Sequence, residues 1–115
     1  KRQLYACRYY MAADHWQVVR RDEKGKKHEG NHETLAIVDV PPQVIKVAVD
    51  AARAIGSGLY GVDLKQFGKL VKVIEVNDNP NLDVGVEDLV LKQSLYQKVM
   101  EYFLLRLDAQ TRQRP

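Results

Sequence analysis

Three side chains that carry oxygen, Asp63, Glu75 and Asn77, lie in two short apolar runs with the pattern of β-strands. Because side chains alternate along a strand, Glu75 and Asn77 point the same way, while Ile74 points to the other side, into a core. A carboxylate in an apolar strand is costly without a partner. A hard divalent cation is one such partner: Mg²⁺, or Mn²⁺ in its place, takes oxygen ligands and shares them with substrate phosphates.

Asp63 joins this face if the two strands form an antiparallel hairpin in which Asp63 lies directly opposite Glu75. That register leaves residues 68–70 as a three-residue loop, with a glycine available for positive φ. A shift by one residue would turn Asp63 to the opposite side of the sheet. The alternative is a solvated hairpin face that carries these side chains by chance, and the pattern leaves both interpretations open.

The segments that must position this hairpin (59–76) have the pattern of a mixed fold. We expect strands at 4–11, 16–19 and 35–38, with a charged, exposed loop at 20–33. A helix with an alanine-rich apolar stripe begins at Pro41-Pro42 and ends before Gly56.

A second helix is expected to begin at a capping box of Ser94 and Gln97, after a turn-rich loop at 77–81. Its core stripe consists of Leu95, Val99, Phe103 and Leu107. The polar tail 110–115 is expected to fray. This order predicts an α+β fold, an antiparallel β-sheet with two main helices packed on one face.

The length of 115 residues indicates one domain or a fragment of one, and we expect a fragment. The net charge of +3 fits an anionic ligand without indicating nucleic acid. Neither a membrane-spanning run nor a signal-peptide pattern is found. The single cysteine, Cys7, excludes an internal disulfide framework, favours a cytoplasmic location and is interpreted as a small buried strand residue.

Residues 28–32 match the zinc-protease pattern HExxH, which requires a helix so that His28 and His32 share one face. Gly30 and Asn31 are poor helix formers, and no apolar stripe surrounds the motif. We therefore expect a loop here, with a zinc hydrolase as the alternative.

Arg8 lies in the tyrosine-rich first strand, where a guanidinium needs an anion. A triphosphate or a structural carboxylate partner would each serve. The neighbouring Tyr5, Tyr9 and Tyr10 leave a third alternative, a stacking surface for single-stranded nucleic acid, which the mild net charge disfavours.

The run Gly61-Val62-Asp63-Leu64, followed by Val73-Ile74-Glu75-Val76-Asn77-Asp78-Asn79-Pro80, resembles the C-terminal lobe of ATP-grasp ligases. The likeness is greatest to the RimK-type branch, which includes glutamate ligases and glutathione-synthase-like enzymes. The strand at 4–11 looks like the strand that opens this lobe. The resemblance covers nearly all of the chain; it is fairly specific for the superfamily and weak on substrate.

The resemblance implies an ATP- and Mg²⁺-dependent ligase that joins a carboxylate substrate to an amine acceptor through an acyl phosphate. Asp63, Glu75 and Asn77 would be the metal ligands. Arg8 would contact the transferring phosphoryl group, and Ile74 would pack on the adenine. Asn79 would lie near the acyl acceptor, although relatives often have a small residue and a glycine around the proline of this loop, where this chain has Asn79-Pro80-Asn81.

In such enzymes a central nucleotide-binding lobe and an N-terminal domain would precede Lys1, so residues 1–115 are expected to supply half of an active site. The isolated chain would then have no ligase turnover. A degenerate lobe retained for protein contacts stays an alternative. Whether the protein forms a homo-oligomer is a question that the sequence leaves open.

Overall fold

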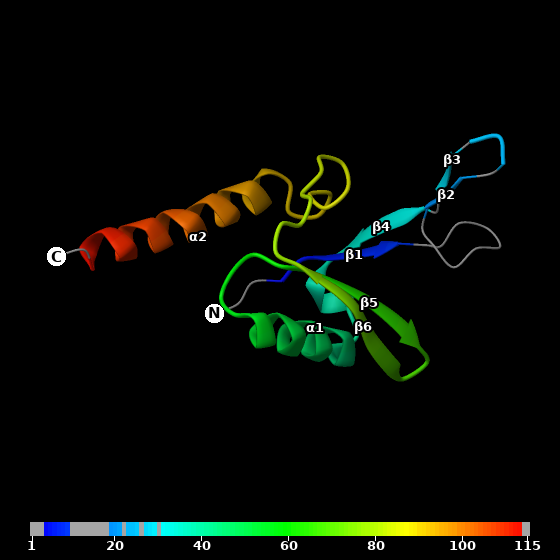
Figure 1. Cartoon of the computed structure of the whole chain (residues 1–115), viewed down its shortest axis with the longest axis horizontal. Helices are drawn as coiled ribbons and strands as arrows, with labels where there is room; N and C mark the ends of the chain where they lie inside the picture. The colour runs from blue at the N-terminus through cyan, green and yellow to red at the C-terminus, as the bar shows by residue number, and fades with distance from the viewer. Residues whose placement is uncertain (1–3, 10–18, 22, 26, 30, 114–115) are drawn as a thin grey trace. The chain divides into compact units, whose positions relative to one another are not determined.

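The computed structural model describes residues 4–9, 19–21, 23–25, 27–29 and 31–113. In chain order the elements are β1 (Ala6–Tyr9), β2 (Val19–Arg21), β3 (Lys27–Glu29), β4 (His32–Leu35), the 3-10 helix η1 (Ile37–Asp39), α1 (Pro42–Ile55), β5 (Gly61–Phe67), β6 (Leu70–Asn77) and α2 (Gln93–Arg112) (Figure 1). The predicted α+β class and both main helices are confirmed. None of the helices within the described part of the chain is long and apolar enough to cross a membrane.

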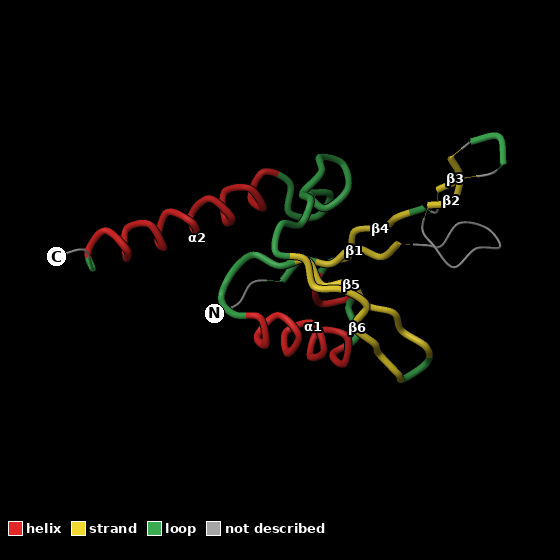
Figure 2. Tube along the Cα trace, in the orientation of Figure 1, coloured by secondary structure: helices red, strands yellow, loops and turns green. Residues whose placement is uncertain are grey.

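The described strands form three antiparallel two-stranded ladders, β1–β4, β2–β3 and β5–β6, where the sequence predicted one sheet (Figure 2). The loop expected at 20–33 is wrong, because β2, β3 and the start of β4 lie within it. Backbone hydrogen bonds build a ladder whatever the charge of its side chains, which is why a polar segment can pair. The strand expected at 35–38 is also wrong, because β4 ends at Leu35 and the 3-10 helix η1 follows. Residues 10–18, which include part of two expected strands, lie outside the described residues.

The chain divides into two compact units, Lys1–Pro41 with Leu82–Val90, and Pro42–Asn81 with Leu91–Pro115. In the first unit, the Thr34 hydroxyl donates a hydrogen bond to the Val86 carbonyl, which ties the segment 82–90 to β4. The Sγ atom of Cys7 lies 3.6 Å from the Thr34 Oγ1 atom. Burial raises the pKa of the Cys7 thiol, although the hydrogen bond with Thr34 opposes this shift. Cys7 is thus a half-buried strand residue with little thiolate character, close to its expected role.

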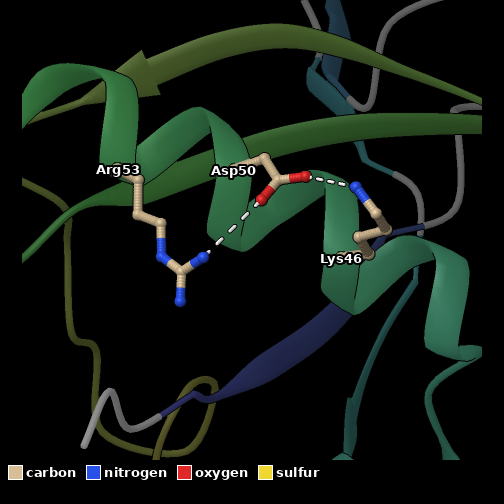
Figure 3. Close-up of polar contacts among 3 residues, drawn as sticks. All are labelled: Lys46, Asp50 and Arg53. Atoms are coloured by element: carbon tan, nitrogen blue, oxygen red, sulfur yellow. Dashed lines mark hydrogen bonds and ion pairs between the residues drawn. The ribbon is translucent and has the colours of Figure 1, made fainter.

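In the second unit, α1 packs against β5 and β6. The helix has the predicted bounds, and the Gly56 N–H donates to the Ala52 carbonyl at 3.1 Å. Its exposed face carries a charged row in which the Asp50 carboxylate lies 2.6 Å from Lys46 Nζ and 4.0 Å from Arg53 Nη1 (Figure 3). The hydrogen bond from Lys46 lowers the pKa of Asp50. This row is a solvated helix face with i, i+3 and i, i+4 spacing.

The second main helix, α2, differs from its prediction in three ways. Ser94 forms no capping box, since its hydroxyl donates to the Leu91 carbonyl at 2.5 Å and Lys92 occupies the N-cap. Of the expected core stripe, Leu95 is fully buried, but Phe103 and Leu107 are 42% and 60% exposed. The helix also continues to Arg112, through part of the tail that was expected to fray.

Candidate functional site

The hairpin β5–β6 brings the predicted metal ligands onto one face. Asp63 pairs directly with Glu75, and Gly61 pairs with Asn77, which confirms the predicted register. Residues directly opposite in an antiparallel ladder have Cβ atoms about 4.5–5.5 Å apart. Because Glu75 and Asn77 are two residues apart on β6, the two carboxylates and the amide lie side by side.

A β-bulge interrupts this ladder immediately next to the carboxylate pair. The register shifts between Asp63 and Leu64, so Leu64 pairs with Val73 and Ile74 is left without a partner. The Ile74 side chain is 61% exposed, and the expectation that it points into a core is therefore wrong. Because of the extra residue, Val73 pairs with Leu64 and lies on the same face as Val76, opposite the carboxylates, which strict alternation would not allow.

The bulge also changes the hairpin loop. Phe67 pairs with Leu70, so the loop consists of Gly68 and Lys69 where the sequence predicted three residues, 68–70. Gly68 has φ +58°, in the left-handed region that two-residue hairpin loops require. The loop is one residue shorter because β6 takes up that residue at Ile74.

The loop after β6 folds back on the hairpin. Asn77 Oδ1 accepts a hydrogen bond of 2.8 Å from the backbone N–H of Asn79, which forms an Asx turn. A Cβ atom added at Gly61 would lie 2.9 Å from Pro80 Cβ, so Pro80 lies directly against the start of β5. The sequence pattern alone gave no role to Gly61. The signal that could have revealed one is that the predicted register places a glycine directly opposite Asn77.

The electrostatics of this face fit a divalent cation. Asp63 and Glu75 are exposed, and neither forms a hydrogen bond or ion pair with another residue in the described part of the chain. Like charges directly opposite in a ladder are destabilising, and a dication would remove that repulsion. Two carboxylates and one amide oxygen are hard ligands, and they leave coordination positions of Mg²⁺ for water and phosphate.

The zinc interpretation of residues 28–32 is wrong. His28 and Glu29 lie in β3, and His32 lies in β4, so the segment does not form the single helix that would direct both histidines at one ion. No group of three or more His, Cys, Asp or Glu side chains gathers around a potential metal position in the described segments.

Arg8 lies in β1, where its backbone pairs with Glu33 of β4. Its side chain, like those of Tyr9 and Tyr10, lies outside the described residues. Arg8 belongs to the first unit and the hairpin to the second, so its predicted contact with a phosphoryl group stays a prediction.

Comparison with known proteins finds distant relatives. The chain is 32% identical over 71 residues to a protein of Coxiella burnetii named probable alpha-L-glutamate ligase, a match that covers 62% of this chain and 23% of that protein. It is 39% identical over 77 residues to a protein of the same name from Xanthomonas campestris, covering 67% of this chain and 25% of that protein. The chain thus spans about a quarter of the length of these curated relatives. No protein-family profile and no solved structure matches it significantly.

Proposed function

We propose that this chain is the C-terminal lobe of an ATP-grasp ligase of the RimK type, which joins a carboxylate to an amine at the expense of ATP. The names of the relatives support a ligase, with L-glutamate as a substrate. The observation that carries the proposal is the Asp63–Glu75 pair, two carboxylates directly opposite one another and next to Asn77, with no hydrogen-bond or ion-pair partner among the described residues.

In this proposal Asp63, Glu75 and Asn77 hold Mg²⁺ against the nucleotide phosphates. The cation neutralises the charge on the phosphates and favours attack by the substrate carboxylate. The hairpin fixes the backbone of both residues on adjacent strands, so cation binding has only their side chains to order. The hydrogen bond from Asn79 turns the oxygen of the Asn77 amide toward the turn, and one lone pair stays available for a cation.

Three further residues have proposed roles. Ile74 packs on the adenine, and its exposure at the bulge makes its side chain available for this contact. Asn79 lies near the acyl acceptor. Arg8 contacts the transferring phosphoryl group, where a guanidinium stabilises the charge that develops.

The proposal is tested by titrating the ¹⁵N-labelled chain with Mn²⁺ and measuring paramagnetic broadening by NMR. We expect broadening to centre on Asp63, Glu75 and Asn77, and to disappear in Glu75→Gln. The control is Glu101→Gln, which makes the same change of charge on the exposed face of α2. Broadening that survives Glu75→Gln, or that spreads evenly over all carboxylates, would contradict the metal site.

Activity provides the second test, made in a longer ligase chain that contains this lobe. There Glu75→Gln is expected to abolish glutamate-dependent ATP hydrolysis, while circular dichroism shows an unchanged fold. Near-normal turnover would remove Glu75 from the site. A wild-type chain that binds Mn²⁺ but does not support turnover in any such context would favour the degenerate lobe.

A further inference from the structure

The start of β5 and the loop after β6 approach more closely than any side chain would allow. A Cβ atom at position 61 would lie 2.9 Å from Pro80 Cβ and 3.9 Å from Pro80 Cα, and real Cβ contacts essentially never fall below 3.0 Å. The Cβ atom of proline belongs to its ring and cannot rotate away. Any residue other than glycine at position 61 therefore has to move the backbone of the loop.

This contact lies beside the one residue of the proposed metal site that is not a carboxylate. Gly61 pairs directly with Asn77, and Pro80 follows Asn77 by three residues. Between them, the N–H of Asn79 binds Asn77 Oδ1 at 2.8 Å. The Pro80 ring packed on Gly61 and the Asx turn thus close the same short loop.

We propose that Gly61 is a positioning residue for the site: because it has no Cβ, Pro80 packs on β5 and holds the Asn77–Asn79 turn in place. This turn then fixes the direction of the Asn77 amide oxygen on the face of the hairpin that carries Asp63 and Glu75. The consequence for metal binding rests on the proposed function, but the consequence for the turn does not.

The turn is tested without metal, through the hydrogen-exchange rate of the Asn79 amide in the 115-residue chain. In Gly61→Ala we expect this rate to rise about fivefold, the effect of losing one hydrogen bond of ordinary net strength. Gly68→Ala is the control, because it strains the hairpin at its other end, where a Cβ meets nothing within 4 Å. It should leave the exchange of the Asn79 amide unchanged.

Steric origin is tested by repeating Gly61→Ala in two backgrounds. Pro80→Gly removes the opposing Cβ, so Gly61→Ala should have no further effect on the Asn79 amide there. Pro80→Ala keeps that Cβ, so the rise should persist. Exchange unaffected by Gly61→Ala in the wild-type background, or an equal effect in both backgrounds, would overturn the proposal.

The Mn²⁺ titration separates this inference from the function that it accompanies. If Gly61→Ala weakens the broadening at Asn77 and speeds exchange at Asn79, both stand. If the wild-type chain binds no Mn²⁺ but the Asn79 amide responds as expected, Gly61 positions the turn and the proposed function fails. If Mn²⁺ binds and the amide does not respond, the function stands and this inference is wrong.

Discussion

Removing one charge from the Asp63–Glu75 pair is expected to stabilise the metal-free chain. The direct pairing places the Cβ atoms of Asp63 and Glu75 about 5 Å apart, and the two charges are taken at the same separation. Two unit charges at that separation repel by about 0.8 kcal/mol in water. At an ionic strength of 0.15 M, with a Debye length of about 8 Å, the repulsion falls to about 0.4 kcal/mol. Glu75→Gln should therefore raise the free energy of unfolding by about 0.4 kcal/mol in EDTA.

Magnesium should reverse the order of stability. The wild-type chain gains the free energy of binding, which is about 1.4 kcal/mol when Mg²⁺ is at ten times its Kd. The Glu75→Gln variant has lost one of the two carboxylate charges, and its neutral amide oxygen binds the cation less well, so it gains little. The two chains should thus exchange places as Mg²⁺ is added, because the charge that binds the cation is the charge that destabilises the hairpin without it.

The assay is urea unfolding followed by circular dichroism, in EDTA and across a Mg²⁺ series, at 0.15 M and 1 M salt. High salt should erase the difference in EDTA, since it screens exposed charges. Glu101→Gln is the matched control and should show no difference in either condition. If Glu75→Gln lowers stability in EDTA, the carboxylates do not repel one another. If Mg²⁺ stabilises both chains equally, the cation does not bind this pair.

Three further predictions test other parts of the structure. Gly68→Ala, at φ +58°, should lower the free energy of unfolding by about 1 kcal/mol, and Gly68→Asn by less, because asparagine tolerates the left-handed region; urea midpoints check this. Leu95→Ala should cost about 3 kcal/mol, since Leu95 is fully buried, whereas Met100→Ala, at a position 68% exposed, should cost under about 0.5 kcal/mol, as measured by thermal unfolding. Lys46→Gln should raise the pKa of Asp50 toward its ordinary value in an NMR titration, because it removes the largest cause of the lowering and leaves the weaker one, the charge of Arg53. Because the folded-state pKa of Asp50 is lowered, the stability that this pair contributes is present above the ordinary carboxyl pKa and is lost as pH falls through the lowered value. Lys46→Gln should reduce that loss.

Much of the second unit could be predicted, because its signals are local. The proline-led start and the glycine at the end of α1 bound a single apolar stripe, and the helix lies where these residues place it. The register of Asp63 with Glu75 followed from strand alternation, since a slip by one residue would bury a carboxylate. The two-residue loop could not be predicted in the same way, because it results from the bulge in β6, and a bulge depends on which face of the strand must be apolar.

The wrong predictions for α2 share one cause: the same local sequence pattern is compatible with different tertiary contacts. Ser94 and Gln97 have the spacing of a capping box, but the chain enters α2 through Lys92 at φ 49°, and the Ser94 hydroxyl turns back to Leu91. Phe103 continues the apolar spacing of Leu95, yet only Leu95 has neighbours that bury it. Periodicity predicts which residues share a face and is silent on whether anything covers that face.

The sequence by itself determined the element types of the second unit and the face shared by Glu75 and Asn77, because alternation along a strand is a local property of the backbone. It placed Asp63 on that face only for one hairpin register, which the structure confirms. The tertiary structure decided the bulge at Ile74, the pairing of the charged segment before β4, and the contact of Gly61 with Pro80. Each of these depends on how one segment pairs with or packs against another segment, and a contact of this kind leaves no periodic mark on either segment.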